Sequence, residues 1–177
     1  MTRIILFLFL AFTATCTWAI GATSEMVRVG SGEIRYLGLI KVYDASLYLN
    51  AEQARTRQVL DSDVSRCLKL DYDVSLKVEH FVEGAETIMA KQHNQATIEA
   101  VRPEIDMLHQ AYRDVEPGDS YFLCYDSKSG VTSLALNAQQ LVAVESPQFA
   151  ELYFGIWLGE KNPIDTKLRD QLLSRQL

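Results

Sequence analysis

The stretch GEIRYLGLIKVYDASLYLN, residues 32–50, is rich in the branched and aromatic side chains that favour β-strands. A short strand over residues 26–29 precedes it, and the intervening Gly30-Ser31-Gly32 offers positions that tolerate positive φ. We therefore expect a hairpin that turns at residues 30–32 and continues as one strand over residues 33–50. Arg35, Lys41 and Tyr43 occupy odd positions among leucines, so this pattern predicts that they share one mainly apolar face.

The segment after this hairpin combines one more strand with helices. Residues 66–73 alternate apolar and polar side chains, the pattern of a half-buried antiparallel strand. Ser75 is a candidate helix N-cap, and apolar residues then recur at steps of three and four along residues 78–115. Asn94 interrupts this stripe and Pro103 should split or kink it, because proline removes a helical hydrogen bond.

Three short strands are expected next, at residues 120–126, 131–136 and 140–145. Ser146-Pro147 combines a cap with proline at the first helical position, and this helix should stop at Gly159. A last helix begins at Asp165. This order of elements predicts an α+β fold: a large, mostly antiparallel sheet covered on one face by a layer of helices.

The N-terminus has the features of a cleavable export signal. Arg3 precedes an apolar run over residues 4–12, and small residues follow at Ala19, Gly21 and Ala22. We expect cleavage between Ala19 and Ala22, so residues 1–22 form the signal peptide, residues 23–177 form one domain, and the protein is periplasmic. The apolar run is far shorter than the roughly 20 residues of a membrane-spanning helix, so the mature protein should not be transmembrane.

The composition argues against several classes of partner. Removing residues 1–22, which hold one arginine and no acid, changes the net charge from −6 to −7, and no cluster of basic residues occurs. Nucleic acid is therefore not expected as a partner. The chain has no glycine loop typical of phosphate binding, and His80, His93 and His109 lie 13 and 16 residues apart without a ligand motif. We expect no cofactor and no metal.

Cys67 and Cys124 remain after signal removal, each in an expected strand. Export would allow them to form a disulfide if those strands are neighbours. The alternative is two buried free thiols, and the sequence leaves both open.

Several motifs resemble the bacterial chalcone isomerase-like family. They are Gly32-Glu33-Ile34-Arg35, the strand Lys41-Val42-Tyr43 leading to Leu47-Tyr48-Leu49, Gly118-Asp119 before a strand, and Ile156-Trp157-Leu158-Gly159. The resemblance implies a large antiparallel sheet covered by helices, with a ligand cleft between them. Proteins of this fold include plant enzymes that close a flavanone ring, plastid proteins that bind fatty acids, and members with no established reaction.

The residues that such enzymes place around their substrate are mostly missing here. Arg35 is the candidate for their arginine, but Tyr43 stands at the position of their threonine. Where they carry a tyrosine and an asparagine at a helix start, this chain has residues 78–80 and 85–86, which are neither. The catalytic residues, if there are any, are unknown at this point, and we expect a protein that is not a chalcone isomerase.

The first hypothesis is therefore a non-catalytic protein that binds a fatty acid or similar amphipathic carboxylate, with Arg35, Lys41 and Tyr43 as ligand-binding residues. Arginine suits a carboxylate because its planar fork bonds both oxygens. In the competing interpretation, Arg35 pairs with an internal acid such as Glu33 or Glu79, and Lys41 extends its charged end to solvent. Two other functions stay open, an isomerase or intramolecular lyase that uses Arg35 on an unknown substrate and a structural or interaction module. Phe149, Tyr153 and Trp157 are expected to pack in the core.

Overall fold

A computed structural model describes residues 26–56 and 58–174, and the expected signal peptide lies outside them. Within these residues six strands form one antiparallel sheet in sequence order. They are β1 (Met26–Tyr36), β2 (Ile40–Asn50), β3 (Arg66–Tyr72), β4 (Ser120–Asp126), β5 (Val131–Leu136) and β6 (Gln139–Glu145). The helices are α1 (Val78–Gln92), α2 (Gln95–Glu99), α3 (Arg102–Ala111), α4 (Pro147–Leu158) and α5 (Thr166–Leu172).

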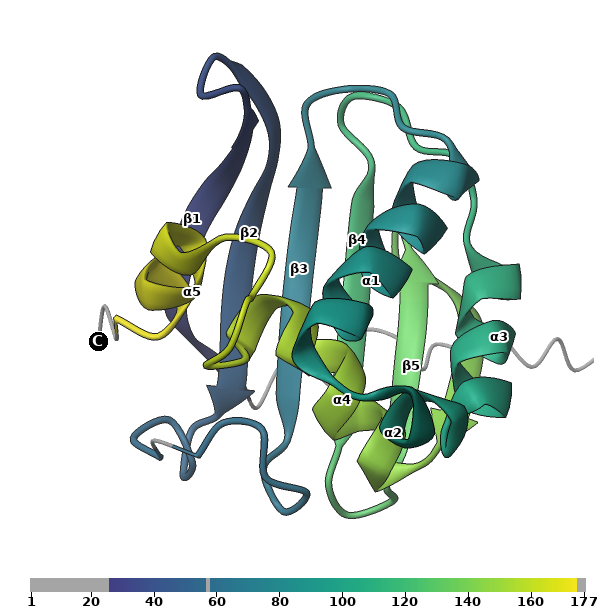
Figure 1. Ribbon diagram of the computed structural model, residues 1–177. Helices are drawn as coiled ribbons and strands as arrows, with labels where there is room; N and C mark the ends of the chain where they lie inside the picture. Colours follow the sequence, from purple (N-terminus) through teal and green to yellow (C-terminus); the bar gives the residue numbers. More distant parts are fainter. Residues whose placement is uncertain (1–25, 57, 175–177) are drawn as a thin grey trace, which may run out of the picture.

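The helices cover one face of this sheet, and the other face carries none of them (Figure 1). This arrangement is the α+β fold that the sequence predicts. Alternation along β2 explains how the core forms, because Tyr43, Ala45, Leu47 and Leu49 are buried while the residues between them are not. Residues 73–119, which include α1, α2 and α3, form one excursion between the neighbouring strands β3 and β4.

The turn of the first hairpin differs from the expectation. It lies at residues 37–39, where Leu37 (φ 50°) and Gly38 (φ 72°) adopt the left-handed conformation and Leu39 N donates to Tyr36 O (3.1 Å). Gly30 and Gly32 are inside β1 instead, because α5 packs against them. A Cβ atom added at Gly30 would lie 2.2 Å from the Leu172 carbonyl oxygen.

The helix boundaries follow local signals with one correction. Ser146 Oγ accepts from Phe149 N (3.1 Å) at the start of α4, and Pro103 lies in the first turn of α3, as the sequence predicts. Ser75 does not cap α1, since its hydroxyl donates to the Glu116 carboxylate. The N-cap position of α1 belongs to Lys77, whose backbone N donates to His80 Nδ1 (3.0 Å), and Asp114 Oδ1 accepts from Val78 N (3.0 Å).

Candidate functional site

Arg35 and Lys41 do not lie on the same sheet face as Tyr43, so the predicted common face is wrong. The turn at residues 37–39 interrupts the expected strand, and a register irregularity follows, since Ile34 pairs with Tyr43 whereas Arg35 pairs with Lys41. Val42 is thus one extra residue in β2, which changes the alternation of side chains. We call the sheet face opposite the helices the outer face.

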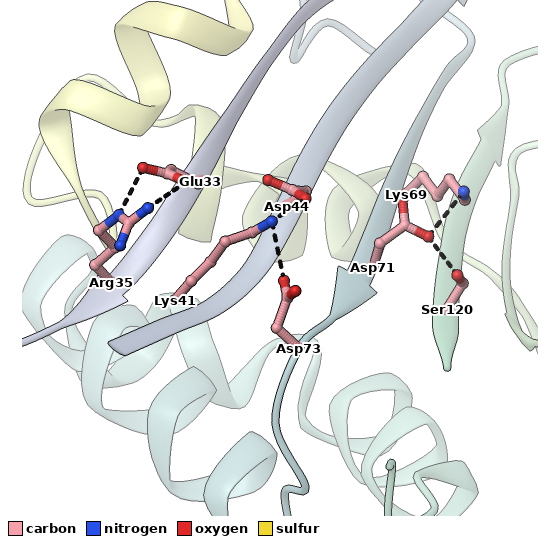
Figure 2. A network of polar contacts seen from close by, with 8 residues as sticks. All are labelled: Glu33, Arg35, Lys41, Asp44, Lys69, Asp71, Asp73 and Ser120. Atoms are coloured by element: carbon pink, nitrogen blue, oxygen red, sulfur yellow. Dashed lines mark hydrogen bonds and ion pairs between the residues drawn. The ribbon is translucent and has the colours of Figure 1, made fainter. Parts of the chain in front are cut away.

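On the outer face both cations have carboxylate partners (Figure 2). Arg35 Nε donates to Glu33 Oε1 (2.7 Å), which is the competing interpretation of the sequence, and this contact raises the pKa of Arg35 and lowers that of Glu33. Lys41 Nζ lies 2.6 Å from Asp44 Oδ2 and 3.2 Å from Asp73 Oδ2, and both contacts raise the pKa of Lys41. The geometry therefore brings neither cation to a site between sheet and helices.

Tyr43, the third predicted residue, does lie between sheet and helices. It borders a cavity of about 120 Å³ between β2, β3, α1 and α4. The lining is mostly apolar and aromatic: Tyr43, Tyr72, Leu76, His80, Phe81, Gly84, Ala85, Tyr112, Ile156, Trp157 and Ile164. Apolar walls with a few polar groups are the composition of small-molecule sites. This cavity, called the tyrosine cavity below, is the candidate functional site.

Hydrogen bonds distinguish the tyrosines of this region. Tyr43 Oη accepts from Trp157 Nε1 (3.1 Å), and Tyr112 Oη lies 2.8 Å from Tyr153 Oη. The Tyr72 hydroxyl, on a side chain that is almost fully buried, makes no hydrogen bond to any residue that the structure describes. Burial raises the pKa of Tyr43, Tyr72 and Tyr112, so all three hydroxyls keep their protons.

The cavity can therefore donate hydrogen bonds to a ligand oxygen. Tyr43 uses its oxygen as an acceptor for Trp157, which leaves its own O–H free to donate, and Tyr72 has a whole hydroxyl available. The Tyr72 oxygen is not among the buried polar atoms, so a ligand oxygen can reach this hydroxyl and accept from it in the place of water. Two exposed residues, His80 and Ile164, also line the cavity and place its mouth beside the start of α1.

A second hollow is larger, about 330 Å³, and more polar. It lies beside the C-terminal ends of α1 and α4, and its lining includes Gln92, His93, Glu151, Glu160 and Lys161. Gln92 Nε2 donates to the carbonyl oxygens of Gly155 (2.8 Å) and Asn162 (3.3 Å). These bonds join α1 to the end of α4, which indicates a structural role for this glutamine.

Arg66 is a buried cation that the sequence analysis did not single out. Its guanidinium lies 4.7 Å from the ring centroid of Tyr125 and 4.8 Å from that of Phe154, and Nη1 donates to the carbonyl oxygens of Val59, Asp61 and Val64. Burial lowers the pKa of Arg66 to about 10, so it stays charged. The usable signal was its place at the start of an apolar strand, directly before Cys67.

The other residues named in the sequence analysis take part in a disulfide or in the packing of the core. Cys67 and Cys124 are opposite each other on β3 and β4 and form a disulfide. Phe149 and Tyr153 are fully buried, as predicted, whereas Trp157 is core and cavity wall at once. Within the described residues no group of three or more His, Cys, Asp or Glu could hold a metal ion, and no helix is long and apolar enough to cross a membrane.

Comparison with known proteins agrees with the fold of a helix-covered antiparallel sheet. A family model described as chalcone isomerase-like matches residues 17–174. The chain belongs to the chalcone isomerase-like family. No curated protein sequence matches it. Among solved structures, it is similar to a fatty-acid binding protein of Arabidopsis thaliana, with a TM-score of 0.63, 17% sequence identity, and coverage of 84% of this chain and 87% of that one. At this identity the likeness shows the fold.

Proposed function

We propose that this protein binds a fatty acid or similar amphipathic carboxylate in the tyrosine cavity. The observation that carries the proposal is the Tyr72 hydroxyl, which has no hydrogen-bond partner among the described residues, is not among the buried polar atoms, and borders a mostly apolar cavity. The structural likeness to a fatty-acid binding protein supports the same class of ligand. In this arrangement Tyr72 and Tyr43 donate hydrogen bonds to the head group.

The size of the cavity limits how the ligand can lie. About 120 Å³ is well below the roughly 300 Å³ at which small-molecule pockets usually begin. The cavity therefore holds the head group and the first carbons, and a long tail leaves through the mouth beside His80 and Ile164 or displaces α1 from α4. Medium-chain acids should bind with less rearrangement than long-chain acids.

This assignment replaces Arg35 with tyrosines as the head-group contacts. Arg35 is on the outer face and bonded to Glu33, so neither a carboxylate in the cavity nor an enolate in an isomerase reaction would meet it. The described cavity lining contains no arginine or lysine. A protein that binds its ligand without converting it is the function that these contacts favour.

The experiment uses Trp157, which is the one tryptophan left when residues 1–22 are removed. The wild type, Tyr72→Phe and Arg35→Ala are each titrated with decanoate and, separately, with decanol. Binding is followed by the change in the fluorescence emission of Trp157. We expect saturable decanoate binding that Tyr72→Phe weakens by about tenfold, since one hydrogen bond to a charged acceptor is lost. Arg35→Ala should bind like the wild type.

Two outcomes would reject the assignment. If Arg35→Ala abolishes binding while Tyr72→Phe does not, the ligand lies on the outer face. If neither native mass spectrometry of the purified protein nor the titration detects a fatty acid, the lipid function is wrong, and a structural or interaction module remains.

We also propose that the protein acts in the periplasm. The signal-like sequence of residues 1–22 supports export, and a disulfide is the kind of bond that persists in oxidising compartments. Cell fractionation with mass spectrometry of the N-terminus tests this, and a cytoplasmic protein with an intact N-terminus would contradict it.

A further inference from the structure

The turn of the β1–β2 hairpin is unusually apolar for an exposed segment. Four large apolar side chains are exposed there within five residues: Tyr36 (62%), Leu37 (79%), Leu39 (82%) and Ile40 (56%). Among the residues that the structure describes, only two other large apolar side chains, Met107 and Ile164, are exposed to solvent. We call residues 36–40 the hairpin tip. Exposed apolar side chains that gather in one place commonly mark a binding surface.

The backbone presents these side chains outward. Leu37 and Gly38 both have positive φ, which closes the turn tightly, and nothing lies within 4 Å of a Cβ built on Gly38. Figure 1 shows the turn projecting at the upper left with no helix beside it. A non-glycine residue in the left-handed conformation is strained, so Leu37 is an unexpected choice for a turn that only needs to be soluble.

Side chains with both apolar and polar parts border the apolar tip. Tyr36 combines an apolar ring with a polar hydroxyl, and Arg35 and Lys41 flank the tip on the paired strands β1 and β2. Aromatic rings and long cationic side chains at the border of an apolar segment are typical of the interface between lipid acyl chains and head groups. Both cations are already ion-paired, so they add little attraction for an anionic surface.

The tip also lies at the cavity end of the sheet. Tyr43 pairs with Tyr72, the last residue of β3, whereas Ile40 and Lys41 extend β2 beyond that end. Tyr43 and Tyr72 both line the tyrosine cavity. A surface touched by the tip would therefore face the same end of the molecule as the cavity.

The shape of the tip distinguishes a bilayer from a protein partner. A stable protein interface usually needs about 800 Å² from each partner, with 20 to 30 residues a side. The tip offers five residues on a narrow, convex turn, which can enter a fluid layer without a matching groove. We propose that the hairpin tip inserts into the surface of a lipid bilayer and docks the protein there by apolar contact.

The test is vesicle flotation with the chain that begins at residue 23, which keeps every helix and strand described. Vesicles of phosphatidylcholine, with and without phosphatidylglycerol, are mixed with the wild type, with Leu37→Asn/Leu39→Ser, and with Met107→Asn. Asparagine tolerates the positive φ at position 37. Met107 is 48% exposed on α3, so Met107→Asn is the matched control for loss of one exposed apolar side chain.

We expect the wild type and Met107→Asn to float with both kinds of vesicle. The affinity of the tip variant for the vesicles should be lower by about tenfold or more. Equal thermal unfolding of the three proteins shows that folding is intact. In Leu39→Trp, the added emission should be quenched by phosphatidylcholine with brominated acyl chains. Quenching of the wild-type Trp157 is the baseline, since Trp157 is 8% exposed.

Several results would overturn the proposal. The proposal is wrong if the wild type stays in the soluble fraction with both kinds of vesicle. It is also wrong if the tip variant floats as well as the wild type. Binding only to phosphatidylglycerol that added salt abolishes would indicate charge attraction instead of apolar insertion. A wild-type dimer that the tip variant lacks, seen by sedimentation without lipid, would make the tip a protein interface. None of these results depends on what the tyrosine cavity binds.

Discussion

Trp157 on α4 donates its indole N–H to the hydroxyl oxygen of Tyr43 on β2, at 3.1 Å, across 114 residues of sequence. This bond joins the helical layer to the sheet at the wall of the tyrosine cavity. It also orients the Tyr43 hydroxyl so that the oxygen faces Trp157 and the proton is left for another acceptor.

The first prediction concerns this bond. Tyr43→Phe leaves a buried indole N–H without an acceptor and should lower the free energy of unfolding by about 1–3 kcal/mol. Tyr43→Phe combined with Trp157→Phe should cost less than the sum of the single changes, with a coupling of about 1 kcal/mol. Urea unfolding of the four proteins measures it. Additive losses would show that the two side chains contribute independently.

A second prediction uses two glycines with opposite surroundings. Gly30→Ala would place a methyl group 2.2 Å from the Leu172 carbonyl oxygen, so α5 must move and the protein should lose about 1–3 kcal/mol of stability. Gly84→Ala, inside α1 with nothing within 4 Å, should instead gain up to about 1 kcal/mol. Thermal unfolding compares the two variants. A Gly30→Ala protein as stable as the wild type would contradict the close packing of α5 on β1.

The third prediction concerns the Cys67–Cys124 disulfide. It closes a loop of 57 residues, for which the chain-entropy estimate of stabilisation is about 4 kcal/mol. Reduction of the wild type and the double change Cys67→Ala/Cys124→Ala should both lower the urea midpoint by comparable amounts. Treatment of the alanine variant with a reductant is the control and should change nothing. An unchanged urea midpoint after full reduction of the wild type would show that the disulfide does not stabilise the folded protein.

The fourth prediction is a pH dependence from His109. Burial lowers the pKa of His109 below the ordinary 6.5, so the unfolded chain takes up its proton first as the pH falls. The neutral imidazole thus favours the folded state above pH 6.5, and this contribution is lost as the pH falls toward the lower folded value. Glu86, 3.7 Å away, favours the charged form and Arg102 opposes it.

The measurement is the free energy of unfolding from pH 7.5 to pH 5. The wild type should lose more stability over this range than His109→Gln, because glutamine does not titrate. Parallel curves for the wild type and His109→Gln would contradict the burial effect.

Most of the fold could be predicted because local signals and hydrophobic periodicity agree. The strands at residues 120–126 and 131–136 and the cap at Ser146 follow from such signals. The first hairpin could not be placed in the same way, because Gly30, Gly32 and Gly38 look alike in sequence. Gly30 and Gly32 make room for α5, and only Gly38 makes a turn, a difference set by a helix some 140 residues later.

The misplaced hairpin turn also changed the prediction of the ligand-binding residues. One misplaced turn and one extra strand residue, Val42, reverse the side on which Arg35 and Lys41 project, so two of the three predicted ligand residues lie on the outer face. Tyr43 was placed correctly because the alternation continues unbroken from it into the core. Tyr72 was seen only as a strand residue, since its missing partner is a property of the packed interior.

Between β3 and β4 the chain leaves the sheet once, and the disulfide joins these two strands at the end of the pair away from that excursion. Every peptide bond from Cys67 to Cys124, including all those of α1, α2 and α3, therefore lies inside a covalent ring. A protease that cuts in the exposed loop around Pro117 would open this ring without releasing a fragment, and the two pieces would separate only when a reductant is added.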